Sequence, residues 1–157
     1  MERRQTRMPR QWLIADERNA AGLPVLLRKL PRDAGVIFLF VDAPKTERRK
    51  LLAGVRRIAR RRNLILLDEL AGDAARVHSL PELRRALLAR TPLILLSPMF
   101  ETRSHPEWKP LPRMRAATFT RLARRRLGAL GGMNEKRFAK VATLGFQAWA
   151  AIDRFRT

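Results

Sequence analysis

The hydrophobic positions along the chain gather into seven short runs that are apolar almost throughout. Strands with this pattern are buried on both faces, as they are in a parallel sheet covered by helices. The runs occupy residues 11–16, 35–41, 63–68, 75–79, 92–97, 127–132 and 145–152. The pattern therefore predicts an α/β protein built on seven parallel strands.

Four of the segments between these runs have the period of an amphipathic helix. Apolar side chains recur at every third or fourth position, and arginines occupy much of the opposite face. The segments are residues 46–62, 81–90, 115–126 and 134–144. Thr46 and Asn134 stand at the start of the first and the last segment, and both are residue types that cap helices. We therefore expect four helices, two of them with these caps.

Alternating strands and helices fit two architectures, a doubly wound open sheet and a (β/α) barrel. Both bind ligands at the carboxyl ends of their strands. Polar residues directly after a predicted strand are therefore the first candidates for function. They are Asp16, Asp42, Asp68, His78, Gly131, Gly132 and residues 97–105. No linker or internal repeat divides the sequence, so we expect one domain over residues 1–157.

The charge balance adds an attraction for anions. The chain has 34 Lys and Arg against 14 Asp and Glu, which gives a net charge of +20. Such a field attracts nucleic acids, phosphorylated small molecules and acidic surfaces alike. Because the charges lie at helical spacing within apolar segments, we interpret them first as solvated helix faces. Binding of nucleic acid or another polyanion is the alternative.

Composition also excludes some kinds of site. The chain has no cysteine, which rules out disulfides and cysteine-ligated metals. Its longest wholly apolar run, residues 36–41, is too short to span a membrane. The basic first residues are not followed by the apolar stretch of a secretory signal. These features predict a cytoplasmic protein without membrane association.

Two groups of residues carry candidate chemistry near anions or protons. Gly131 and Gly132 precede a predicted helix, where glycines either let a phosphate approach the backbone or only form a tight turn. The two histidines are His78 and His105. An imidazole exchanges protons near neutral pH, although an isolated histidine is more often only a hydrogen-bonding residue.

Three aspartates offer a candidate metal site. Asp16, Asp42 and Asp68 each follow a predicted strand, where parallel strands bring their ends together. Carboxylate oxygens are the ligands that Mg²⁺ prefers, so a joint magnesium site is one interpretation. Single acids at strand ends are common, which leaves ordinary surface roles as the other.

Five segments, in this order, resemble the family of thiamine phosphate synthase and thiazole tautomerase (TenI-like) proteins. They are WLIADER, VHSLPE, SPMFETRSHP, ALGGM and GFQAWAAI, and together they extend over most of the chain. Members of that family are eight-unit (β/α) barrels. The synthase joins a pyrimidine diphosphate to a thiazole phosphate with Mg²⁺ and releases pyrophosphate. The tautomerase rearranges a thiazole carboxylate phosphate.

The resemblance implies a set of site residues. Contacts to the phosphate or the substrate fall on Thr102, Ser104, Gly131, Gly132 and the backbone of Trp149 and Ala150. The catalytic base of the tautomerase falls on His78, and His105 stands where the synthase has a catalytic lysine. Asp68 stands where the synthase has a Mg²⁺-binding aspartate. The implied cofactor is therefore Mg²⁺ for synthase activity and none otherwise.

The sequence also departs from the family. Leu39 and Val41 stand where the synthase grips the pyrimidine diphosphate with Arg and Lys, and Arg76 replaces a serine. One strand–helix unit is missing between residues 63–68 and 75–79. We therefore expect an incomplete TIM-barrel-like fold of about seven strands, either opened or paired in a homodimer. The expected function is thiazole phosphate binding with proton-transfer or condensation chemistry, or binding alone in a catalytically decayed paralogue.

Overall fold

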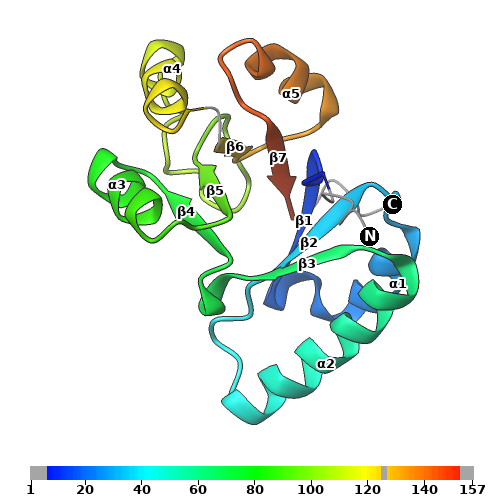
Figure 1. Ribbon diagram of the computed structural model, residues 1–157. Helices are drawn as coiled ribbons and strands as arrows, with labels where there is room; N and C mark the ends of the chain where they lie inside the picture. The colour runs from blue at the N-terminus through cyan, green and yellow to red at the C-terminus, as the bar shows by residue number, and fades with distance from the viewer. Residues whose placement is uncertain (1–6, 125–126, 153–157) are drawn as a thin grey trace, which may run out of the picture.

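The structure of the protein is a computed structural model, which describes residues 7–124 and 127–152. Within those residues seven strands form a single sheet with the order β3-β2-β1-β7-β6-β5-β4 (Figure 1). The strands are β1 (Gln11–Ala15), β2 (Ala34–Phe38), β3 (Ile65–Asp68), β4 (Ala74–Val77), β5 (Leu93–Leu96), β6 (Leu127–Leu130) and β7 (Ala148–Ala151). Every pairing is parallel. The seven predicted strands and their direction are confirmed.

The pairing of the first strand with the last distinguishes the two predicted architectures. β1 lies beside β7, with Gln11 opposite Trp149. Neighbours in the sheet are therefore neighbours in the chain, in a cyclic order that a doubly wound sheet does not have. Between β3 and β4 the described residues show no pairing, and a single 3-10 turn, η2 (Glu69–Ala71), replaces the helical crossover. The fold is a TIM-barrel-like α/β fold that lacks one unit, as predicted.

The open seam leaves β3 and β4 as the two edges of the sheet in the described part of the chain. An unpaired edge presents backbone N–H and C=O groups that can pair with another chain. The homodimer expected on these grounds stays a prediction, which a measurement of the mass in solution tests.

The four predicted helices are confirmed. They are α2 (Lys45–Arg62), α3 (Leu80–Leu88), α4 (Arg113–Leu122) and α5 (Glu135–Ala142). The predicted segment 115–126 ends in two residues that lie outside the described residues. Asn134 caps α5 as expected, because its side chain accepts a hydrogen bond from the backbone N–H of Arg137. The prediction for Thr46 is wrong: α2 begins at Lys45 with Pro44 at the cap position, so Thr46 lies inside the first turn.

Two short elements that follow β1 were not predicted from the sequence. They are the 3-10 helix η1 (Glu17–Gly22) and the helix α1 (Leu23–Lys29). α1 buries Leu23, Leu26 and Leu27 on one face and has Pro24 in its first turn. Seven residues give fewer than two full turns. A segment of this length is too short to show a helical repeat of apolar positions.

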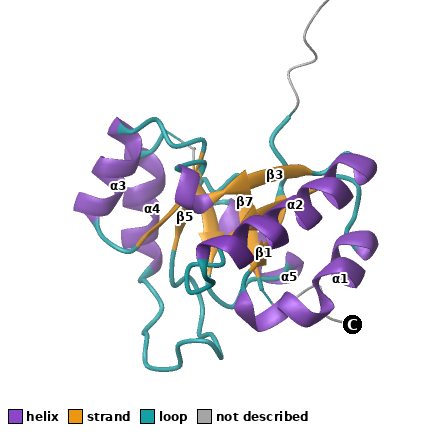
Figure 2. Cartoon of the chain, turned by 90° about the horizontal axis from the view of Figure 1, so that it is seen from below, coloured by secondary structure: helices purple, strands orange, loops and turns teal. Residues whose placement is uncertain are grey.

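The core consists of three clusters of buried apolar side chains, two under the helices and one inside the barrel. α1 and α2 pack on β1–β3, and α3, α4 and α5 pack on β4–β7. Figure 2 shows α3 and α4 on one side of the strands and α1 and α2 on the other. The third cluster lies inside the barrel, where the inward-facing side chains of the strands meet. These three clusters account for the near-continuous apolar runs, since the strands are buried on both faces.

Trp12 fills the inside of the barrel at the amino-terminal half of β1. Its side chain is fully buried, and its indole N–H donates to the carbonyl oxygen of Pro9 at 2.9 Å. Gly35 is its partner on β2, and a Cβ at that position would lie 2.3 Å from the indole ring. The ring therefore occupies the space that a side chain at residue 35 would take. The opposite end of the barrel interior is left to smaller side chains and to the cavity described below.

No helix within residues 7–124 and 127–152 combines the length and the apolar character needed to cross a membrane.

Candidate functional site

A cavity of about 120 Å³ opens at the carboxyl ends of the strands. Ile14, Leu39 and Leu130 belong to the apolar cluster inside the barrel and also line this cavity, so they form its floor. The remaining lining residues are Arg18, Arg76, His78, Ser97, Pro98, Thr102, Ser104, His105, Trp108, Gly131, Gly132, Met133, Ala150, Ala151 and Ile152. Several residues that the strand-end rule predicted line this cavity, whereas Asp16, Asp42 and Asp68 do not.

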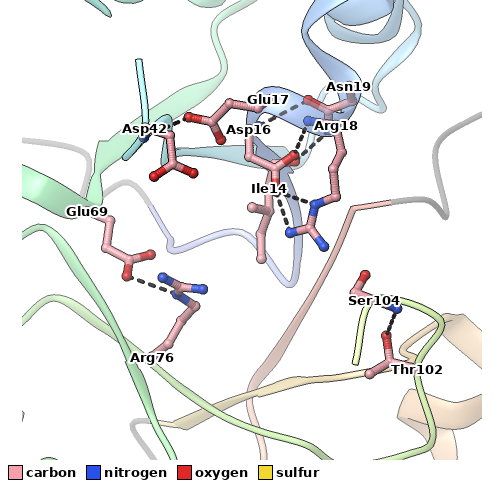
Figure 3. A network of polar contacts seen from close by, with 10 residues as sticks. All are labelled: Ile14, Asp16, Glu17, Arg18, Asn19, Asp42, Glu69, Arg76, Thr102 and Ser104. Atoms are coloured by element: carbon pink, nitrogen blue, oxygen red, sulfur yellow. Dashed lines mark hydrogen bonds and ion pairs between the residues drawn. The ribbon is translucent and has the colours of Figure 1, made fainter. Parts of the chain in front are cut away.

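The loop after β5 and the turn after β6 are bonded to one another. The backbone N–H of Met99 donates to the carbonyl of Leu130 at 2.9 Å, and that of Phe100 donates to Gly131 at 3.1 Å. The loop then brings Thr102 and Ser104 to the cavity, where the Thr102 hydroxyl accepts a hydrogen bond from the Ser104 N–H at 3.3 Å (Figure 3). The two segments form one continuous wall.

Gly131 and Gly132 are required by the geometry of this wall. Their φ angles are 101° and 58°, in the left-handed region that favours glycine. A Cβ on Gly132 would lie 2.3 Å from the carbonyl oxygen of Glu101, and one on Gly131 would lie 2.9 Å from Pro98. Both residues line the cavity, and the absence of side chains allows the loop after β5 to pack closely against this turn.

The turn is held on its far side by α5. Arg137 donates from its guanidinium to the carbonyl of Gly132 at 2.5 Å and lies over the ring of Phe100. Met133, between the glycine pair and the Asn134 cap, is buried and lines the cavity. The amino end of α5 therefore follows the cavity wall directly, where the helix dipole favours an anion.

His78 is oriented at the end of β4 by contacts to Ser97. Its Nδ1 lies 3.1 Å from the carbonyl oxygen of Ser97 and 3.0 Å from the hydroxyl oxygen of the same residue. A carbonyl only accepts hydrogen bonds, so this contact assigns the proton of a neutral His78 to Nδ1. Nε2 then carries the lone pair that a general base needs.

His105 and Trp108 form an aromatic wall beside His78. The rings of His105 and Trp108 stack with centroids 4.1 Å apart, and Trp108 meets the His78 ring edge-on at 5.1 Å. Nδ1 of His105 is 3.3 Å from a carboxylate oxygen of Glu107. Trp108 therefore bridges the two histidines and offers a flat surface to a ring-shaped ligand.

Trp149 and Ala150 have different positions relative to the cavity. The indole of Trp149 belongs to the outer core under the helices, and its backbone N–H donates to the carbonyl of Arg10 at 2.9 Å. Ala150 lines the cavity together with Ala151 and Ile152. The contribution of β7 to the site thus begins one residue later than the resemblance implies.

Asp68 lies outside the cavity lining. Its two carboxylate oxygens accept hydrogen bonds from the guanidinium of Arg48 at 2.5 and 3.2 Å, and the N–H of Leu70 donates to the same side chain. The ion pair is largely buried beside α2. A carboxylate with these three donors has little capacity left for Mg²⁺.

The other two aspartates do not join Asp68. Asp16 is buried, caps η1 and pairs with Arg18, whereas Asp42 is exposed and donates its backbone N–H to Glu17 at 3.0 Å. No group of three or more His, Asp or Glu side chains in the described ranges is placed to hold a metal ion. These donor sets do not fit Mg²⁺, and we derive no reaction step from a metal.

Two arginines of the lining were missed as functional candidates. Arg18 follows the strand-end Asp16, and Arg76 stands at the position where the family has serine. Both side chains line the cavity, whereas the sequence marked the first only as part of a motif and the second only as a departure. Arg18 follows the predicted strand 11–16 closely, so the strand-end rule could have found it, whereas Arg76 lies within the predicted strand 75–79 and carries no such signal.

The fold and the cavity define an incomplete (β/α) barrel with a cavity at the carboxyl ends of its strands, lined by arginines, histidines and hydroxyl groups. Thiamine phosphate pyrophosphorylase from Pyrococcus furiosus is similar, with a TM-score of 0.73, 14% identity, and coverage of 94% of this chain and 87% of that one. The enzyme of the same name from Bacteroides thetaiotaomicron is also similar, with a TM-score of 0.57 and 12% identity. The match covers 94% of this chain and 84% of that one. Pyrophosphorylase is another name for the synthase to which the sequence has its resemblance.

No protein-family model matches the chain, and no curated protein sequence matches it either. At these identities the two solved structures show a common fold. The chain therefore has the fold of thiamine phosphate pyrophosphorylase with one strand–helix unit fewer than a complete barrel.

Proposed function

We propose that this protein binds a phosphorylated thiazole in the cavity at the carboxyl ends of its strands and transfers a proton on that ring. One observation carries the proposal: the glycine pair, Thr102, Ser104 and His78 line the same cavity. They come from three separate strand ends. The fold shared with thiamine phosphate pyrophosphorylase supports the choice of a thiazole phosphate as ligand.

The phosphate is assigned to the wall made by the loop after β5 and the turn after β6. Hydroxyl groups of Thr102 and Ser104 donate to phosphate oxygens, and backbone N–H groups of Gly131 and Gly132, which line the same cavity, add further donors. The amino end of α5 favours the negative charge at this place. The heterocycle then lies toward Trp108 and His78.

Proton transfer is better supported than condensation. Leu39 is buried in the cavity floor at a position where the synthase resemblance implies a cation for the diphosphate, and Val41 is half exposed. Asp68, the implied Mg²⁺ ligand, is engaged by Arg48. The cations that would bind the diphosphate and the metal ligands of a synthase are therefore not present in the expected form. The expected base of a tautomerase, His78, is present.

The proposed step needs only one side chain that both accepts and donates a proton. Nε2 of His78 removes a proton from one position of the thiazole ring system, which leaves an anion delocalised over the ring and an imidazolium. The same proton returns to a second position, which restores neutral His78 and yields the tautomer. The Ser97 carbonyl keeps Nδ1 protonated throughout, so the base stays at Nε2.

Substitution His78→Ala is expected to lower the rate of tautomer interconversion by about 10²-fold or more, which is the usual contribution of a positioned general base. The affinity for thiazole phosphate is expected to change by less than about threefold, because His78 is assigned to the ring and not to the phosphate. Proton NMR of a thiazole carboxylate phosphate in D₂O measures the rate, and calorimetry measures the affinity.

The matched variant is His105→Ala, which removes the other histidine of the same cavity. It is expected to weaken ligand binding through loss of the stacked surface on Trp108 and to leave the proton-transfer step within about tenfold of wild type. Binding of thiazole phosphate by the wild-type protein without any proton exchange would contradict the catalytic half of the proposal and favour a binding-only paralogue.

Polyanion binding is the second candidate, and the surface of α2 favours it. This helix carries nine Lys and Arg residues and one Glu, and Arg48 and Arg62 alone among its basic residues have side-chain hydrogen bonds to other described segments. The affinity for a nucleic acid bound to that face would fall steeply as salt is added. The logarithm of the binding constant would fall by roughly one for each tenfold rise in salt and each phosphate contact.

Fluorescence anisotropy with duplex and single-stranded oligonucleotides at several salt concentrations measures this salt dependence. A salt-independent or undetectable signal would contradict it.

A further inference from the structure

A second cavity opens at the amino ends of the strands, at the end of the barrel opposite the candidate site. Its volume is about 1060 Å³, against about 120 Å³ for the first cavity. The segments that lead into β1, β2, β5 and β7 form most of its wall, together with the first residues of β3 and β6. The proposed thiazole phosphate chemistry uses none of these segments, so this end of the barrel is available for a separate role.

Arginines dominate the charge of this second cavity. Among its lining residues in the described ranges, Asp33 is the only acid, and its carboxylate accepts a hydrogen bond from the Gln11 side chain at 3.3 Å instead of pairing with a cation. The arginines of the lining are Arg7, Arg10, Arg32 and Arg90. The opening therefore has four permanent positive charges, which form no ion pair within residues 7–124 and 127–152.

Further cations surround the opening, because each of the five α-helices in the described chain ends on this side of the sheet. A short link leads from the carboxyl end of each helix to the amino end of the next strand. The last turn of every one of these helices contains basic residues and no acidic ones: three in α2, two in α1 and one each in α3, α4 and α5. The positive surface thus extends beyond the cavity on several sides.

The helix dipole explains the position of these bases but not their number. A cation is stabilising near the carboxyl end of a helix, and one residue is sufficient for that effect. Like charges that gather without counter-charges repel one another and destabilise the compact state. α2 alone ends in three consecutive arginines, directly before Asn63, which lines the cavity together with the four arginines above. An anion with charges at regular intervals along its length would neutralise such a surface.

The floor of the cavity is apolar and includes two aromatic rings. Leu93, Leu127, Phe138 and Phe146 line it, and each is at most 5% exposed. Arg10 lies over the Phe138 ring, with 4.9 Å between its guanidinium carbon and the ring centroid. Guanidinium groups and aromatic rings are the surfaces on which unpaired nucleobases stack. A base inside a duplex cannot reach such a floor, whereas a base of a single strand can.

We infer that the amino end of the barrel binds single-stranded nucleic acid, with phosphates at the rim arginines and one or more bases in the cavity. The side chains of Arg7, Arg32 and Arg90 make no hydrogen bond, ion pair or ring contact in the part of the chain that the structure describes, so their donors are left for phosphate oxygens. The inference is independent of thiazole phosphate binding. It differs from polyanion binding on α2 because it requires unpaired bases and a different face.

Fluorescence anisotropy with labelled oligonucleotides of about ten nucleotides tests this site, since that length lies within the site sizes of known single-strand-binding domains. The probes are a single-stranded RNA, a single-stranded DNA of the same sequence, and the duplex of each. The protein is expected to bind the single strands at least about tenfold more tightly than the duplexes, because only unpaired bases enter the cavity. The tighter of the two single strands identifies the preferred nucleic acid.

The double variant Arg32→Gln/Arg90→Gln removes two rim charges from segments that three strands separate in the sheet. Its affinity for the single strands is expected to fall at least about tenfold at low salt. The slope of the logarithm of the binding constant against the logarithm of the salt concentration is expected to become shallower by about 1.4, or about 0.7 for each lost phosphate contact. Both residues are exposed, so the melting temperature and the binding of thiazole phosphate are expected to stay unchanged.

Arg49→Gln/Lys50→Gln is the matched control, because it removes the same charge from exposed positions of α2 outside the cavity lining. These positions lie about 18 Å along the helix axis from the arginines that end α2, a distance at which salt screens charges strongly. The control is expected to keep its single-strand affinity within about threefold of wild type.

Arg10→Lys separates stacking from charge, because it keeps the charge and removes the flat guanidinium. It is expected to weaken single-strand binding at least about fivefold, as for the loss of one stacking surface, with an unchanged salt slope.

The other outcomes overturn the inference in distinguishable ways. Duplexes bound as tightly as single strands would remove the role of the cavity floor. Affinity lost in the α2 control and kept in Arg32→Gln/Arg90→Gln would place the nucleic acid on α2. A polyglutamate of equal charge bound as tightly as the single strands would show an acidic peptide surface instead. No binding of any oligonucleotide at about 50 mM salt, where phosphate contacts are strongest, would overturn the site and leave thiazole phosphate binding untouched.

Discussion

The Gly132→Ala protein is expected to bind thiazole phosphate roughly 100-fold more weakly than wild type, a loss of nearly 3 kcal/mol. At φ 58° an alanine stores backbone strain, which is about 1–3 kcal/mol for a non-glycine residue in this region. The new Cβ would also lie 2.3 Å from the Glu101 carbonyl oxygen and 2.8 Å from the guanidinium of Arg137. The loop after β5 must move away, and Thr102 and Ser104 move with it. Isothermal titration calorimetry measures the change.

Gly72→Ala is the control for this experiment. Gly72 also has a positive φ, 86°, but a Cβ there meets no atom within 4 Å, and the residue lies in the turn between β3 and β4 away from the cavity lining. Its substitution is expected to lower stability through backbone strain and to leave binding unchanged. If Gly132→Ala and Gly72→Ala bound the ligand equally well, the glycine wall would not be the phosphate site.

The Trp12→Ala protein is expected to lose about 3–5 kcal/mol of unfolding free energy, the range for removal of a large buried aromatic side chain. The ring fills the inside of the barrel against Gly35, and its removal leaves a cavity that rigid strands cannot close. The Pro9 carbonyl also loses its hydrogen bond. Chemical denaturation monitored by circular dichroism measures the change, and Trp12→Phe gives a smaller loss if the alanine variant does not fold.

Trp108→Ala is the matched variant for stability. Trp108 is 38% exposed at the cavity edge and contacts His78 and His105 instead of the barrel interior. A loss of at most about 1 kcal/mol is expected, as for most surface substitutions outside special contacts. A Trp12→Ala protein that is as stable as Trp108→Ala would show that the barrel interior does not depend on this ring.

The strands and the longer helices could be predicted because their signals are local. A run such as residues 35–41 is apolar throughout, and α2 repeats its pattern over five turns. The cap of α2 could not be found in this way, because caps are recognised in a sequence by residue types whose side chains bond to the backbone. Pro44 makes no such hydrogen bond. The closure of β1 on β7 is a contact between the two ends of the chain, and no short-range pattern specifies it.

The residues of the candidate site also differ in whether local patterns or tertiary contacts place them. His78, Ser104 and Gly132 could be placed together because parallel strands deliver their carboxyl ends to one face of the fold. Asp68 could not be interpreted from sequence, because its partner Arg48 is 20 residues away on another element. The two cavity arginines depend equally on tertiary contacts, since Asp16 and Glu69 direct them. Ion pairing at strand ends thus decides which polar residues face the ligand.

A crystal structure of the protein soaked with thiazole phosphate tests the central claim most directly. The phosphate is predicted to lie within hydrogen-bond distance of the Ser104 hydroxyl and the backbone N–H of Gly132, with the ring between Trp108 and His78. A phosphate bound at the amino ends of the strands or on the face of α2, with this cavity empty at saturating ligand, would contradict it.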